Sequence, residues 1–154
     1  MLFWLVALFT LVADQITKYV VRTTMKEWES IPLIQDFFHL TYVLNPGAAF
    51  GMLPNKTVFF VAVAAVVIGG IIVFNRRIPA DRILMRLALG LQVGGAVGNL
   101  IDRLRFAHVV DFLDFRIFPV FNFADVAITV GVGLLILEIL RQEAVNKAGS
   151  TGGN

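Results

Sequence analysis

The sequence contains no cysteine and only two histidines among its 154 residues. The absence of cysteine excludes disulfide bonds, thiolate catalysis and cysteine metal ligands within this chain. Two histidines are too few for a typical histidine-rich zinc site, and no H-E-x-x-H, G-x-S-x-G or P-loop pattern occurs. We therefore expect neither a metal ion nor a cofactor.

Charged residues are also scarce, at 16% against 58% hydrophobic residues. This composition, with a mean hydropathy of +0.81, is typical of an integral membrane protein. Four apolar segments are long enough to span the bilayer as helices, at about residues 1–20, 57–75, 83–101 and 123–141. We predict an all-α membrane protein with four transmembrane helices in a single domain, residues 1–154, and a disordered tail from about residue 147.

Basic residues predict the orientation of these helices. Arg76, Arg77 and Arg82 lie in the short connector between the second and third spans, which the positive-inside rule makes cytoplasmic. Both termini are then cytoplasmic, and the long loops at about residues 21–56 and 102–122 face outward. Phe37 to Leu44 in the first loop is rich in aromatic and β-branched residues, which predicts a small extracytoplasmic β-like element. The basic residues that give the net charge of +2 are expected to contact membrane lipids rather than nucleic acid.

Polar residues from separate stretches fall at the outer ends of the predicted spans. An ionisable group at bilayer depth costs roughly 2.5 to 3.5 kcal/mol, so their convergence predicts a buried polar site. The residues are Asp14, Lys18, Asn99, Asp102, Arg103, Asp111, Asn122 and Asp125.

Simpler structural interpretations remain open for several of these residues. Asp14 and Lys18 have the i, i+4 spacing of a helical ion pair. Asn99 is a candidate for an interhelical hydrogen bond, and Asp125 for a stabilising charge in the first turn of a helix. Gly90, Gly94 and Gly98 follow the small-xxx-small pattern of close helix packing.

Two carboxylates in a low-dielectric pocket provide the chemical alternative. Asp111 and Asp125 could share a proton, the ionised member activating a water and the protonated member acting as an acid toward a peptide carbonyl. Asp114 is a rival to Asp111, because spacing alone does not distinguish them. The turn from Asn45 through Pro46 and Gly47 to Phe50 could hold an extended peptide backbone.

Five motifs together resemble the bacterial lipoprotein signal peptidase family, also called signal peptidase II. They are Asp14-Gln15-Ile16-Thr17-Lys18, Asn45-Pro46-Gly47-Ala48-Ala49-Phe50, Gly98-Asn99-Leu100-Ile101-Asp102-Arg103, Val110-Asp111-Phe112 and Phe121-Asn122-Phe123-Ala124-Asp125. Their order, their spacing and the four-span layout match the family. One departure is Ala107, where many members have glycine.

The resemblance implies an aspartic endopeptidase of the bacterial inner membrane, with its active site toward the extracytoplasmic face. The expected substrates are diacylglyceryl-modified prolipoproteins, cut just before the lipidated cysteine, and globomycin-type cyclic peptides are the expected inhibitors. Asp111 and Asp125 correspond to the catalytic dyad. The residues expected to bind substrate or support the dyad are Asn45, Gly47, Asn99, Arg103 and Asn122, with Asp14, Lys18, Asp102 and Ala124 in supporting positions.

A small proton-coupled carrier or channel subunit is the alternative function. A proton relay would distribute its acids across the bilayer. Here they gather at one depth.

Overall fold

The computed structural model describes residues 1–47 and 56–151. Its four helices are α1 (Leu2–Thr24), α2 (Thr57–Asn75), α3 (Ile83–Phe106) and α4 (Phe123–Thr151). All four are long and apolar enough to cross a membrane. The predicted four-helix architecture is therefore confirmed.

Three helices extend further than hydropathy predicts, and α4 continues beyond residue 147 as far as Thr151. α1 ends at Thr24, α3 at Phe106 and α4 at Thr151. Hydropathy falls where charged residues begin, but arginine, lysine, glutamate and alanine favour helix, so the backbone continues past the apolar segment.

α1 lies against α3 along one buried stripe. The buried residues of α1 recur three or four positions apart, as a helix face requires, at Phe3, Ala7, Thr10, Asp14, Lys18 and Val21. A Cβ placed on Gly90 would lie 2.9 Å from the Phe3 carbonyl oxygen, and one on Gly94 would lie 2.5 Å from that of Ala7. The glycine stripe thus packs helix against helix, as predicted.

α4 packs on α3 through further small residues. A Cβ on Gly95 would lie 2.6 Å from the Ala124 carbonyl oxygen, and one on Gly131 would lie 2.6 Å from that of Ala88. Further along α4, the buried Glu138 accepts a hydrogen bond of 3.3 Å from Arg82. α3 is therefore the central helix, with α1 and α4 packed closely against it.

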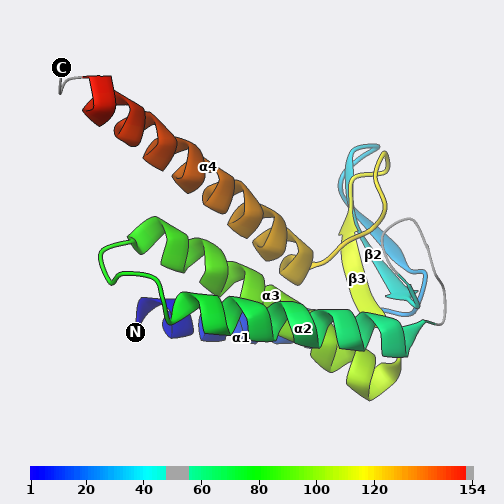
Figure 1. Ribbon diagram of the computed structural model, residues 1–154. Coiled ribbons are helices and arrows are strands. Elements are labelled where there is room, and N and C mark those ends of the chain that lie inside the picture. The colour runs from blue at the N-terminus through cyan, green and yellow to red at the C-terminus, as the bar shows by residue number, and fades with distance from the viewer. Residues whose placement is uncertain (48–55, 152–154) are drawn as a thin grey trace.

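The two long loops contribute a three-stranded antiparallel sheet. Its strands are β1 (Ser30–Ile34), β2 (Phe38–Asn45) and β3 (Val109–Asp114), in the order β1-β2-β3. β2 confirms the predicted β-like element, whereas β1 and β3 lie where the sequence predicts loop. Figure 1 shows the sheet at one end of the helices and both termini toward the other.

Ala107 ends α3 in the left-handed conformation, with a φ of 61° and its N–H donating to the Arg103 carbonyl over 3.0 Å. Glycine adopts this conformation without the steric penalty of a Cβ. The backbone thus explains why glycine would suit this position.

Candidate active site

Asp125 and Asn122 form a reciprocal cap at the start of α4. The Asp125 backbone N–H donates to the Asn122 side-chain oxygen over 3.1 Å, and the Asn122 N–H donates to Asp125 Oδ2 over 3.2 Å. This is the arrangement of a capping box, with aspartate as its acid. The first-turn interpretation of Asp125 is therefore correct, and it leaves Asp125 Oδ1 turned toward α3.

Asp111 reaches the same place from β3. Its Oδ2 accepts a hydrogen bond of 2.9 Å from Asn45 Nδ2, and its Oδ1 accepts one of 2.7 Å from Asn122 Nδ2. The strand register pairs Val43 with Asp111 and so holds the end of β2 beside this carboxylate. Both Asp111 oxygens are thus fixed by amide donors.

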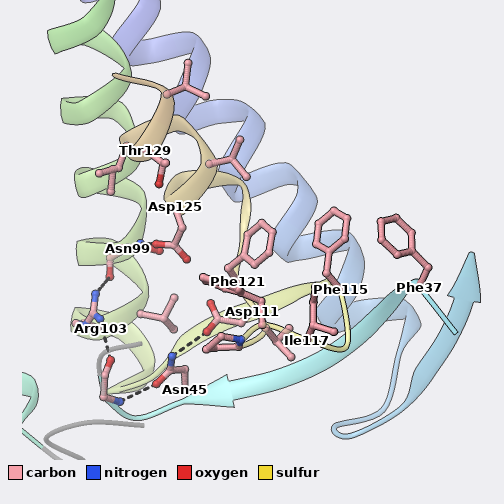
Figure 2. Close-up of a pocket in the computed structure, with 18 residues that line it drawn as sticks. Phe37, Asn45, Asn99, Arg103, Asp111, Phe115, Ile117, Phe121, Asp125 and Thr129 are labelled. Carbon is pink, nitrogen blue, oxygen red and sulfur yellow. Dashed lines mark hydrogen bonds between the residues drawn. The ribbon is translucent and has the colours of Figure 1, made fainter. Parts of the chain in front are cut away.

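Asn99 completes a bridge between the two carboxylates. Its Nδ2 donates to Asp125 Oδ1 over 2.8 Å, while its Oδ1 accepts from Asn122 Nδ2 over 3.2 Å. Figure 2 shows Asp111, Asp125 and Asn99 around one space. The two acids expected to form a dyad therefore face one site and are joined through two asparagine amides.

Lys18 provides the buried cation behind this bridge. Its Nζ lies 2.9 Å from Asp14 Oδ2 and 3.1 Å from Asp102 Oδ2, and it donates to Asn99 Oδ1 over 2.8 Å. Lys18 therefore forms the predicted ion pair with Asp14. It also belongs to the polar site, because it orients the Asn99 amide.

The carboxylates beside Lys18 each hold a piece of backbone. Asp14 Oδ1 accepts a hydrogen bond of 3.0 Å from the Ala124 N–H, and Asp102 Oδ2 accepts one of 3.1 Å from the Val110 N–H. Gln15, which sequence analysis did not single out, donates to Asp102 Oδ1 over 3.2 Å. The supporting cluster therefore positions both acid-bearing segments.

Arg103 lies on α3 beside the site. Its Nη2 donates to the Gly47 carbonyl over 3.1 Å and its Nη1 to the Asn99 carbonyl over 3.4 Å. The Gly47 N–H donates in turn to Asn45 Oδ1 over 2.9 Å. Arg103 thus fixes the end of β2 near the carboxylates (Figure 2). Ala48, Ala49 and Phe50, the rest of this motif, lie outside the described residues.

Asp114, the rival acid, lies away from this site. It accepts a hydrogen bond of 2.7 Å from Thr41 and forms an ion pair of 3.0 Å with Arg116. Burial alone would raise the pKa of Asp114, but the hydrogen bonds from Thr41 and Arg116 outweigh burial, so that this pKa is lowered. Residues three apart on a strand face opposite sides, which explains the separation from Asp111.

The electrostatic environment sets Asp111 apart. The pKa of Asp111 is raised from 3.8 to about 7, mainly by burial and in part by the negative charge of Asp125, while the hydrogen bonds from Asn45 and Asn122 act in the opposite direction. A carboxyl group with such a pKa carries a proton over much of the neutral range.

A cavity of about 720 Å³ opens beside the two carboxylates. Most of its lining is apolar and comes from β3, the loop after it and α4. Phe115 and Phe121 stack at 5.9 Å between ring centroids, and Phe37 meets Phe115 edge-on at 5.5 Å (Figure 2). The local sequence pattern does not reveal this aromatic row as part of the site. Within the described residues, no group of three or more His, Cys, Asp or Glu side chains is arranged to hold a metal ion.

Residues 6–141 match the family model described as signal peptidase (SPase) II. The chain belongs to the signal peptidase II family. A lipoprotein signal peptidase of Moorella thermoacetica is 57% identical over 138 residues, covering 90% of this chain and 92% of that protein. One of Desulfitobacterium hafniense strain DSM 10664 / DCB-2 is 52% identical over 144 residues, covering 93% and 95%.

A solved bacterial membrane enzyme, determined by the in meso method at 2.3 Å resolution, matches with a TM-score of 0.83 and 38% identity. The match covers 90% of this chain and 87% of that one. In this signal peptidase II chain, the described parts of all five motifs meet around the carboxylate bridge. Segments distant in the sequence are thus brought together at one end of the helices.

Proposed function

We propose that the protein is an aspartic endopeptidase that removes the signal peptide from diacylglyceryl-modified prolipoproteins, cutting just before the lipidated cysteine. The observation that carries this proposal is the pair Asp111 and Asp125, which line one cavity and are joined through Asn99 and Asn122. The relatives named lipoprotein signal peptidase support the substrate class.

The two acids take different roles in the reaction. Asp111, with its raised pKa, keeps a proton near neutral pH and donates it to the oxygen of the scissile carbonyl. The ionised Asp125 removes a proton from a water molecule, whose oxygen then attacks the carbonyl carbon. Such a reaction proceeds without a covalent enzyme intermediate.

The amides and cations around the dyad act as positioning groups. Asn45 and Asn122 fix the Asp111 carboxyl group, while Asn99 fixes that of Asp125. Arg103 fixes the backbone at Gly47 through a charge-assisted hydrogen bond. We expect this fixed end of β2 to bind the peptide once the substrate helix has unwound, because a helical carbonyl is already hydrogen-bonded.

The apolar cavity suits a substrate that arrives within the membrane. Phe121, Val126 and Val130 are among its lining residues, and Val126 and Val130 lie on α4 with exposed side chains. A signal peptide and an acyl chain can pack on such surfaces without leaving the bilayer. A globomycin-type cyclic peptide would occupy the same cavity and exclude the substrate.

The basic connector supports an orientation in the bacterial inner membrane. Arg76, Arg77 and Arg82 lie between α2 and α3, at the end of the helices opposite the dyad. A cytoplasmic connector gives cytoplasmic termini and an extracytoplasmic active site. The carrier alternative is not favoured, because the family is a peptidase family.

The experiment is cleavage of a diacylglyceryl-modified prolipoprotein by the purified full chain, beside Asp111→Asn and Asp114→Asn variants of matched thermal stability. We expect Asp111→Asn to lower kcat by about 10²- to 10⁴-fold. Asp114→Asn should remain within about threefold of the parent, because Thr41 and Arg116 hold the Asp114 side chain away from the two carboxylates. An unmodified prolipoprotein should remain uncut. Full activity of Asp111→Asn with loss in Asp114→Asn would contradict the assignment.

A further inference from the structure

α2 makes few contacts with the rest of the protein, yet its first turns touch the active site. None of the most apolar 18-residue stretch of α2 is buried. At its start, however, the Thr57 hydroxyl donates to the Ala107 carbonyl over 3.2 Å, and the Phe60 ring lies beneath the Arg103 guanidinium. The carbon at the centre of that guanidinium is 5.0 Å from the ring centroid.

This distance is within the range of a cation–π interaction, whose energy grows as the pair loses contact with water. Phe60 and Arg103 are both half-buried. The hydrogen bonds from Arg103 to Asn99 and Gly47 use two of its terminal nitrogens. They leave the flat face of the guanidinium to be supported by the ring.

The orientation of Arg103 matters because its charge acts on both carboxylates. Arg103 lines the same cavity as Asp111 and Asp125. A guanidinium that tilts away from Phe60 would weaken its hold on Gly47 and its field at the dyad. Electrostatic groups aid catalysis only when they are held in place before the reaction.

We propose that Phe60 is a positioning residue for the peptidase reaction, which holds the Arg103 guanidinium toward Gly47 and the two carboxylates. Phe60 makes this contribution from the first turn of α2. The inference rests on the proposed function, because its effect is read through cleavage.

The test uses Phe60→Leu, Phe60→Trp and a control, Phe74→Leu, in the purified full chain. Phe74 lies at the other end of α2 and is 50% exposed. We expect Phe60→Leu to lower kcat/KM about 5- to 30-fold, mainly through kcat, as a partly desolvated cation–π contact implies. Phe60→Trp should retain most activity, because tryptophan offers the best ring face, and Phe74→Leu should resemble the parent.

A double-mutant cycle with Arg103→Gln, which removes the cation, separates positioning from a general packing role. If Phe60 acts through Arg103, Phe60→Leu should change kcat little in the Arg103→Gln background. An equal effect of Phe60→Leu in both backgrounds would overturn the inference, and so would a loss in Phe60→Trp or in Phe74→Leu as large as that in Phe60→Leu. Cleavage by the parent tests the proposed function separately, so the two failures are distinguishable.

Discussion

Removal of the Asn45 amide should shift the pH dependence of cleavage upward. Asn45 Nδ2 donates to Asp111 Oδ2 over 2.9 Å and stabilises its ionised form, so Asn45→Ala should raise the pKa of Asp111. A hydrogen bond to a charged group contributes about 1.5 to 3 kcal/mol, and one pKa unit corresponds to about 1.36 kcal/mol. With water partly replacing the amide, we expect a shift of roughly one unit.

The assay is the initial rate of cleavage of a lipidated prolipoprotein between about pH 5 and 9. Because Asp111 must carry a proton, the parent rate should fall as the pH rises through about 7, the pKa of Asp111. In Asn45→Ala, this fall should move to about pH 8. Thr41→Val, which removes the hydroxyl bound to Asp114, is the control. An unchanged or lowered midpoint in Asn45→Ala would refute the proposed role of Asp111.

The same pKa predicts the direction of a stability change. Because folding raises the pKa of Asp111 from 3.8 to about 7, the contribution of this group to stability is fully present below about pH 4 and is lost as the pH rises through about 7. Asp111→Asn should flatten this part of the pH dependence of thermal unfolding. A parent protein whose unfolding temperature rises over this range, with no change in Asp111→Asn, would contradict the prediction.

Three further substitutions test the packing around the site, each by thermal unfolding in detergent. Lys18→Met should destabilise the protein by about 3 to 5 kcal/mol, because the buried carboxylates of Asp14 and Asp102 would lose their cation. A change near zero would contradict the stabilising role of this ion pair. Gly98→Ala should destabilise it by about 1 to 3 kcal/mol, because its methyl group would collide with the Asp14 carboxylate. Gly133→Ala should be tolerated, because no atom lies within 4 Å of its added Cβ. Equal losses of stability in the two glycine variants would contradict the close packing of α3 on α1.

The sequence was sufficient to predict the four spans and the gathering of polar residues at one end of them. Long apolar segments have few alternatives in a membrane, and their ends define one layer of polar residues. The helix ends were harder to predict, because helix propensity continues after hydropathy falls. β1 was missed because all five of its residues are exposed, so it has no alternation of buried and exposed positions.

The partners within the site could be predicted only in part. Asp14 and Lys18 were recognised as a pair from their spacing on one helix, but the contacts of Lys18 with Asp102 and Asn99 depend on how α1 packs on α3. Spacing alone left Asp111 and Asp114 undistinguished, and only the resemblance to the family favoured Asp111. The two faces of β3 separate the two side chains.

The most direct test of the dyad is the Asp125→Asn variant, assayed for substrate binding and for cleavage in the same preparation. Asparagine keeps the shape of aspartate and can still accept a hydrogen bond from Asn99, but it cannot remove a proton from water. The predicted result is capture of the lipidated prolipoprotein with nearly parental affinity and a loss of cleavage of at least about 100-fold. Cleavage at a rate near that of the parent would contradict the role of Asp125 as the general base.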